Sequence, residues 1–162
     1  MDDLTSTIFF YRTGHPFSNF HPSIFTVNGL VFLWAEQYIM CRKAIYFHDQ
    51  ETASLILHAT SPGVCKGLGR KVKQYDDDTW ASVREQVAFE ACLHKFEHNK
   101  KLRAVLLGTG TALLVEAAPT DRIWGIGFTE EDAPAYKHQW GMNLLGQTLM
   151  RVRDELGSRR TL

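Results

Sequence analysis

Residues 33–47 read LWAEQYIMCRKAIYF, and this stretch decides the fold. It contains no Gly or Pro over fifteen residues, which predicts a helix of about four turns. At about 100° per residue, apolar side chains fall on nearly every side of this helix, which indicates that it is buried. Glu36 and Lys43 lie on one of its faces. Burying an unpaired carboxylate or ammonium is costly, so we predict that both side chains serve the function of the protein.

The same two charges have a second interpretation. Glu36 and Lys43 are seven residues apart, which is too far for direct pairing along a helix. In this second interpretation, both are surface charges on an exposed strip of the helix, and the long lysine stem lies over apolar neighbours. The pattern alone leaves both interpretations open.

Length, charge and cysteine content restrict the class of protein. At 162 residues we expect one domain, and the balance of 18 Lys and Arg against 18 Asp and Glu gives no net field toward nucleic acid or an anionic membrane. The three cysteines are scattered among apolar residues, which indicates reduced core thiols and a cytoplasmic protein. The acidic residues 1–5 lack the features of a signal peptide, and no apolar run approaches about eighteen residues, so we expect a soluble chain.

Most of the remaining chain carries helical signals. Caps and apolar periodicity predict helices at 49–59, 61–69, 79–97, 101–107 and 143–157. Strands are predicted at 7–11 and 111–116, loops at 12–22 and 129–140, and a hairpin turn at Asn28-Gly29. The sequence therefore predicts a mainly α (α+β) fold, a compact single domain over 1–162 with about six helices and a small N-terminal β-hairpin.

Two segments carry aromatic side chains beside small residues. In Phe17-Ser18-Asn19-Phe20, either both rings pin a loop to the core, or one ring stacks on a planar base while Asn19 reads its edge. In Trp124-Gly125-Ile126-Gly127, either Trp124 is a core ring or the small residues let a ligand approach the backbone.

Two further groups of side chains have residue types that could bind an anion or a metal. Residues 67–73, GLGRKVK, place Arg70 and two lysines after glycines, which suits either phosphate binding or a solvated basic loop. His94 and His98 lie four residues apart, as a metal pair would, but no further ligand follows at a recognisable spacing. We therefore predict no metal and no cofactor.

Eight short fragments, taken in order, resemble the NADAR, or YbiA-like, family. They are Phe17-Ser18-Asn19-Phe20, Trp34-x-Glu36-x-Tyr38 followed by Lys43, Gly69-Arg70, Trp80, Lys95-Phe96, Leu114-Val115-Glu116, Asp121-x-x-Trp124-Gly125-x-Gly127 and Asn143-x-Leu145-Gly146. The resemblance covers nearly the whole chain, with a core at about 8–156. It implies a compact, mostly helical domain that cleaves N-glycosidic bonds.

The resemblance also implies roles for individual residues. Glu36 is expected to be the catalytic carboxylate and Lys43 an essential amine. Phe17 and Trp124 are expected as walls around a base. The other expected substrate-binding residues are Ser18, Asn19, Tyr38, Arg70, Trp80, Glu116, Asp121, Gly125, Gly127 and Asn143. Some relatives carry an acid between the two glycines, where this chain has Ile126, so Glu116 or Asp121 is a candidate replacement.

The expected activity is hydrolysis of the N-glycosidic bond of ADP-ribosylated guanine, in a nucleoside or in nucleic acid. Lys43, held in an apolar pocket, would form a Schiff base with C1′, while Glu36 stabilises positive charge or activates water. The alternatives are an N-glycosidase acting on phosphoribosylamino-pyrimidine intermediates of riboflavin synthesis, and a non-catalytic module that binds ADP-ribose or nucleotides. We expect a monomer whose partner is an ADP-ribose-containing molecule or ADP-ribosylated guanine in nucleic acid, with no membrane partner.

Overall fold

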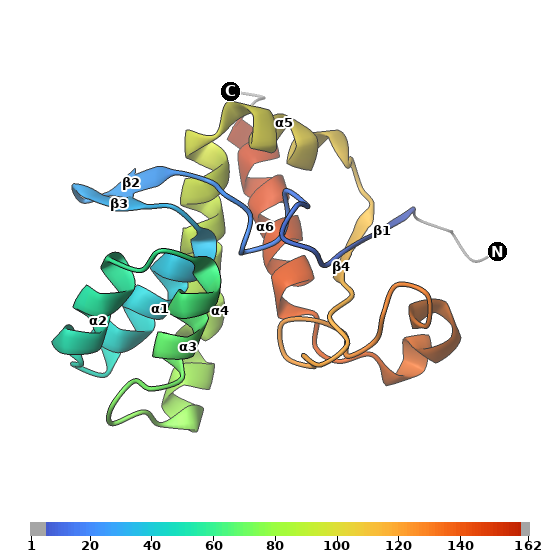
Figure 1. Ribbon diagram of the computed structural model, residues 1–162. Helices are drawn as coiled ribbons and strands as arrows, with labels where there is room; N and C mark the ends of the chain where they lie inside the picture. The colour runs from blue at the N-terminus through green and yellow to red at the C-terminus, as the bar shows by residue number, and fades with distance from the viewer. Residues whose placement is uncertain (1–5, 160–162) are drawn as a thin grey trace. The chain divides into compact units, whose positions relative to one another are not determined.

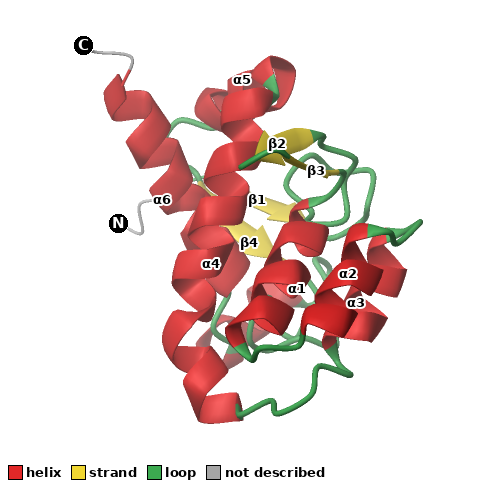
Figure 2. Ribbon diagram, turned by 90° about the vertical axis from the view of Figure 1, so that its left-hand side faces the viewer, coloured by secondary structure: helices red, strands yellow, loops and turns green. Residues whose placement is uncertain are grey.

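A computed structural model of the chain describes residues 6–159, so the acidic stretch at 1–5 lies outside the described residues. Helices dominate, as Figures 1 and 2 show. The elements in order are β1 (Thr7–Phe10), β2 (Phe25–Val27), β3 (Leu30–Phe32), α1 (Ala35–Tyr46), α2 (Gln50–Leu57), α3 (Pro62–Gly69), α4 (Asp77–His98), α5 (Lys100–Gly108), β4 (Leu113–Glu116), the 3₁₀ helix η1 (Ala133–Gln139) and α6 (Leu144–Arg159). The predicted mainly α (α+β) fold is confirmed.

The chain divides into two compact units, which are described separately. One unit consists of residues 19–100, and the other consists of the chain up to residue 18 and from 101 onward. The single domain expected over 1–162 stays a prediction.

In the unit of residues 19–100, α1 contacts α2, α3 and α4 (Figure 2). The strands β2 and β3 pair antiparallel around Asn28 and Gly29, whose φ angles of 50° and 81° suit a tight hairpin turn. The starts of α2, α3 and α4 are capped by side chains, as the sequence predicted for α2: Asp49, Ser61 and Asp76 accept hydrogen bonds from backbone N–H groups of the first turn. Local side-chain chemistry therefore sets the starts of these helices.

The central helix is shorter than predicted. It begins at Ala35 because Trp34 is extended, with φ −142° and ψ 146°. Buried Gln37 explains this start: its Oε1 accepts a hydrogen bond of 2.8 Å from the N–H of Leu33, and its Nε2 donates one of 3.0 Å to the carbonyl of Ile56. One amide thus fixes both the entry of α1 and its packing on α2.

In the other unit, β1 pairs in parallel with β4, and α6 packs against β4. Ile126 is fully buried in an apolar cluster with Val115 and Ala133. Residues 133–139, predicted as part of a loop, form η1, and this part of that prediction was wrong. Ala133, the first residue of η1, is fully buried in this apolar cluster, a tertiary contact that no local signal reveals.

Candidate functional site

Glu36 lies in the first turn of α1, and its N–H donates a hydrogen bond of 3.1 Å to the carbonyl of Asn19. Lys43 follows two turns later, in the last turn of the same helix. Both side chains are half-buried, and the charge of Glu36 acts on the Lys43 amine. The two groups therefore belong to one electrostatic site, which supports the functional interpretation over two independent surface charges.

Aromatic rings surround the Lys43 amine. Its Nζ lies 4.4 Å from the ring centroid of Tyr75 and 6.0 Å from that of Trp80. Burial lowers the pKa of Lys43 below its ordinary value of 10.5 and Arg70 lowers it further, while Glu36 and Asp77 act in the opposite direction. A lysine with a lowered pKa offers more free amine near neutral pH, which is what a nucleophile needs.

Arg70 is held beside this amine by close helix packing. A Cβ placed on Gly69 would lie 2.1 Å from the sulfur of Met40, so glycine lets α3 approach α1 closely. Arg70 follows as the exposed C-cap residue of α3. Gly69 therefore serves helix packing, and Arg70 remains available for an anionic ligand.

Tyr38 and Asn19 are tied into the same unit. The Tyr38 hydroxyl accepts a hydrogen bond of 2.7 Å from Arg42 Nη1, and the same nitrogen pairs with Glu90 on α4. Burial raises the pKa of Tyr38, so its hydroxyl stays protonated at neutral pH. This network ties α1 to α4. Asn19 Oδ1 lies 3.9 Å from the buried thiol of Cys92.

Phe17 and Ser18 belong to the other unit. The Phe17 ring is only 1% exposed and packs edge-to-face on Phe10 at 5.7 Å. The N–H of Ser18 donates to the carbonyl of His15 at 3.0 Å. The ring thus pins its loop to the core, which is the first of the two interpretations given for this segment, and its expected role as a base wall stays a prediction.

The Trp124 segment forms a tight turn held by Asp121. Asp121 Oδ1 accepts hydrogen bonds of 2.9 Å from the N–H groups of Ile123 and Trp124. A Cβ on Gly125 would lie 2.8 Å from that of Ala118, so this glycine serves packing. Gly127 has a φ of 77°, which favours glycine. Trp124 itself is half-buried, and this turn fixes where its ring lies.

Ile126, between the two glycines, is an apolar core residue of its cluster. A carboxylate at this position would be buried among apolar groups, which is costly. Isoleucine at this position therefore suits its apolar surroundings. Glu116, at the end of β4, is half-buried, whereas the carboxylate of Asp121 is used by the turn. Glu116 is accordingly the better candidate for a second carboxylate.

The position of Asn143 directly before α6 suggested an N-cap. Its side chain, however, does not cap this helix. Its Oδ1 accepts a hydrogen bond of 3.0 Å from the N–H of Glu116, and its Nδ2 donates one of 3.0 Å to the carbonyl of Leu114. Its φ of 52° is a conformation that asparagine tolerates better than most residues. Asn143 therefore clamps β4 to the start of α6 and positions Glu116.

We expect Asn143→Ala to destabilise the protein strongly. It leaves two backbone groups of β4 without their side-chain partner and places alanine at a positive φ, costing roughly 2–4 kcal/mol together. Thermal unfolding should show a melting temperature lowered by on the order of 10 °C. Gln147→Ala, on the exposed face of α6, is the control: it removes one exposed hydrogen bond to the carbonyl of Met142 and should lower the melting temperature far less. Equal melting temperatures for both variants would contradict the clamp.

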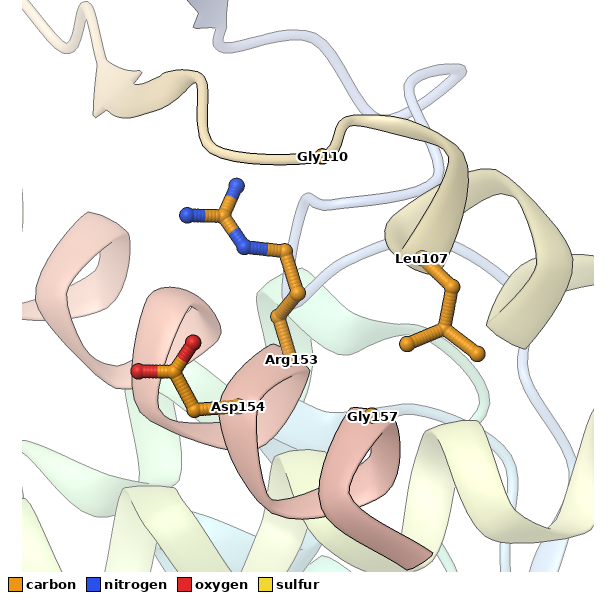
Figure 3. A pocket seen from close by; sticks show the side chains of 5 residues that line it. All are labelled: Leu107, Gly110, Arg153, Asp154 and Gly157. Carbon is orange, nitrogen blue, oxygen red and sulfur yellow. The ribbon is translucent and has the colours of Figure 1, made fainter. Parts of the chain in front are cut away.

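A hollow of about 410 Å³ lies between α5 and α6 and is lined by Leu107, Gly110, Arg153, Asp154 and Gly157 (Figure 3). Arg153 Nη1 donates to Thr109 Oγ1 at 3.0 Å and to the carbonyl of Ala112 at 2.8 Å. These bonds hold the turn before β4. None of the predicted site residues lines this hollow.

Sequence reasoning gave no site role to three residues that lie near the predicted site or within the family fragments. Tyr75 and Asp77 act on Lys43, and the phenol of Tyr75 donates a hydrogen bond of 2.7 Å to Asp77 Oδ1. Lys95 is fully buried on α4, and burial lowers its pKa to about 8. The signal for Lys95 was its place beside the core residue Phe96; no local signal links Tyr75 to Lys43, because the contact is tertiary.

Among the described residues, no helix has the length and apolar character needed to cross a membrane.

Comparisons with known proteins agree with this organisation. The family model of the NADAR domain matches residues 9–157. Protein irg-1 of Caenorhabditis elegans is 37% identical, with 94% of this chain and 81% of that protein covered. N-glycosidase R617 of Acanthamoeba polyphaga mimivirus is 37% identical over 87% of each chain. N-glycosidase YbiA of Escherichia coli (strain K12) is 36% identical over 91% of this chain and 86% of its own.

A solved structure shares the fold. The NMR structure of the E. coli protein YbiA superposes with a TM-score of 0.81 at 34% identity, covering 97% of this chain and 88% of that one. Sequence and structure thus agree over nearly the full length, and the chain belongs to the NADAR domain family.

Proposed function

We propose that this protein is an N-glycosidase that hydrolyses the bond between C1′ of ADP-ribose and a guanine base. Two of the relatives above, R617 and YbiA, carry the name N-glycosidase, which supports the reaction type. The observation that carries the proposal is the pair on α1: a half-buried carboxylate and a half-buried amine of lowered pKa act on each other. A pure binding module has little need of a carboxylate beside an anionic ligand.

The proposed reaction proceeds in two steps. The free Lys43 amine attacks C1′, so the C1′–Nζ bond forms as the C1′–N bond to guanine breaks, and guanine leaves with a proton. The sugar ring opens to a Schiff base. Water activated by Glu36 then adds to C1′, the C1′–Nζ bond breaks, and ADP-ribose leaves with the amine restored. In the simpler version, water activated by Glu36 attacks C1′ directly.

The groups around the Lys43 amine suit the remaining parts of the substrate. Arg70 is exposed and charged beside the Lys43 amine, which suits a diphosphate group. Tyr75 and Trp80 provide ring faces around the same amine. The expected role of Trp124 as a wall around the base stays a prediction. The neutral net charge favours a nucleoside or an end of a strand over long duplex DNA.

A side-by-side assay decides the substrate. ADP-ribosyl-guanosine and a phosphoribosylamino-pyrimidine are incubated with the protein, and the products are separated by chromatography. We expect free guanosine and ADP-ribose from the first substrate, at a far higher rate than any cleavage of the second. Exclusive cleavage of the pyrimidine would support the riboflavin-type alternative, and binding without cleavage of either would support the non-catalytic module.

The pH dependence of the reaction tests the role of Lys43. Only the free amine attacks, so the rate should rise with pH as Lys43 loses its proton, at a pH below that of an ordinary lysine because its pKa is lowered. Asp77→Asn removes a charge that raises this pKa and should move the rise to lower pH. Arg70→Gln removes a charge that lowers it and should move the rise to higher pH. These shifts are read from kcat against pH.

Lys71→Gln is the matched control for charge, since Lys71 is exposed beside Arg70 but is not among the groups that shift the pKa of Lys43. Its profile should coincide with wild type. Profiles of Asp77→Asn and Arg70→Gln that move in the same direction would exclude Lys43 as the titrating group.

A further inference from the structure

The C-terminal end of α4 gathers three metal-binding side chains. His94, Glu97 and His98 each offer a donor atom, and these atoms all lie within 4.8 Å of one another. The residues follow one another at i, i+3 and i+4, so they share one face of the helix. The spacing of the two histidines alone did not indicate a third ligand. The carboxylate between them supplies that ligand.

We propose that His94, Glu97 and His98 bind one divalent transition-metal ion of the zinc class. Tetrahedral zinc with bonds of about 2.1 Å places its ligand atoms about 3.4 Å apart. The three donors therefore need to approach one another by little more than about an ångström, which is within the reach of small side-chain adjustments. Three protein ligands leave the fourth position to water.

Surrounding contacts orient both imidazoles before a metal binds. His98 Nδ1 lies 2.8 Å from the carbonyl of His94, which leaves Nε2 of His98 as its metal ligand. The His94 ring stacks on Phe25, with 6.3 Å between centroids and 9° between planes, and lies 5.9 Å from the Tyr38 ring. Metal-bound histidines typically donate their other ring N–H to a carbonyl or carboxylate, as His98 does here, because this contact fixes the direction of the ring.

Helix electrostatics favour a cation at the same place. Glu97 and His98 are the last two residues of α4, where the negative end of the helix dipole attracts positive charge. Asn99 Nδ2 donates to the carbonyls of Lys95 at 2.8 Å and Ile24 at 3.0 Å, which ties this helix end to the segment entering the β2–β3 hairpin. The proposed site therefore sits on a fixed helix end, next to the Phe25 ring of the hairpin.

The chain contains a matched control for this site. His58, the C-cap residue of α2, makes the same contact, with its Nδ1 2.8 Å from the carbonyl of Ser54. Neither Ser54 nor Leu57, at the positions equivalent to His94 and Glu97, is a metal ligand of this kind. The histidine-to-carbonyl contact alone is thus ordinary helix capping, and only the set of three donors predicts metal binding.

The test uses the full chain without a histidine tag, under reducing conditions, with Zn²⁺ as the probe and excess Mg²⁺ present. Equilibrium dialysis should find one Zn²⁺ per chain. His98→Asn and Glu97→Gln should each weaken binding by at least about tenfold, and His58→Asn should leave it unchanged. A hundredfold excess of Zn²⁺ over its Kd should raise the melting temperature of wild type by roughly 5–10 °C.

A spectroscopic readout distinguishes this site from the cysteines. Co²⁺ bound by nitrogen and oxygen ligands lacks the intense near-ultraviolet charge-transfer band that thiolate ligands produce. We expect a Co²⁺ spectrum without that band, lost in His98→Asn. Zn²⁺ binding of equal strength in wild type and His98→Asn, or no stoichiometric binding by a folded wild-type chain, would overturn the proposal. Because His98 is exposed, the variant should fold normally, which its unfolding curve without metal checks.

Discussion

Glu36→Gln should lower turnover of ADP-ribosyl-guanosine by about 10² or more while leaving substrate affinity largely unchanged. Glutamine keeps the shape of the side chain but cannot accept a proton or balance positive charge at C1′. The charge of Glu36 raises the pKa of Lys43, so its removal increases the fraction of free amine. A loss of turnover therefore cannot come from a more highly protonated Lys43 and must reflect the carboxylate itself.

Single-turnover kinetics with saturating enzyme measures this effect without product release. Glu51→Gln is the control, because Glu51 is an exposed acid on α2 that pairs with Lys73 at 3.5 Å. Its rate should equal that of wild type. A Glu36→Gln variant as fast as wild type would remove Glu36 from the chemistry.

The second large effect is expected at Lys43. Lys43→Arg keeps the positive charge and the contact with the Tyr75 ring but cannot form a Schiff base, and we expect turnover to fall at least about a hundredfold. Lys66→Arg, an exposed lysine in the last turn of α3, is the matched control. A fully active Lys43→Arg variant would leave the reaction to direct attack by water.

Stability separates catalysis from packing at the same position. Burial lowers the pKa of Lys43 in the folded state, so the charged amine destabilises the fold at pH values below that lowered pKa. This destabilisation disappears as the pH rises from the pKa of the folded state to that of the unfolded state. Lys43→Met should thus unfold at the same temperature as wild type or higher near neutral pH, and be inactive. An active but less stable Lys43→Met protein would indicate a structural lysine.

Local chemistry explains which parts of the fold were predictable. The hairpin follows from Asn28-Gly29, and the start of α2 follows from the cap at Asp49, because each depends on neighbouring residues only. The start of α1 was not predictable, since the Gln37 side chain, packed against the carbonyl of Ile56, holds Leu33 and Trp34 outside the helix. The pairing of β1 with β4 joins residues about a hundred positions apart and has no local signal.

The candidate site likewise contains residues with a local sequence signal and residues that depend on tertiary contacts. Glu36 and Lys43 stand out in sequence because they are charges on an otherwise apolar helix, and both proved half-buried and mutually interacting. Tyr75 reaches Lys43 from the loop before α4, where it also packs on Phe47 at 5.3 Å. That contact depends on how α3 packs on α1 through Gly69 and Met40, which only the structure reveals.

Borohydride trapping tests the central claim, the attack of the Lys43 amine on C1′, most directly. Reductant is added during turnover of ADP-ribosyl-guanosine, and the protein is digested and analysed by mass spectrometry. We predict ADP-ribose attached irreversibly to the peptide carrying Lys43, and none on Lys43→Arg, with at least one guanosine released for each trapped adduct. Active enzyme that turns over substrate under the same conditions with an unmodified Lys43 peptide would contradict the account.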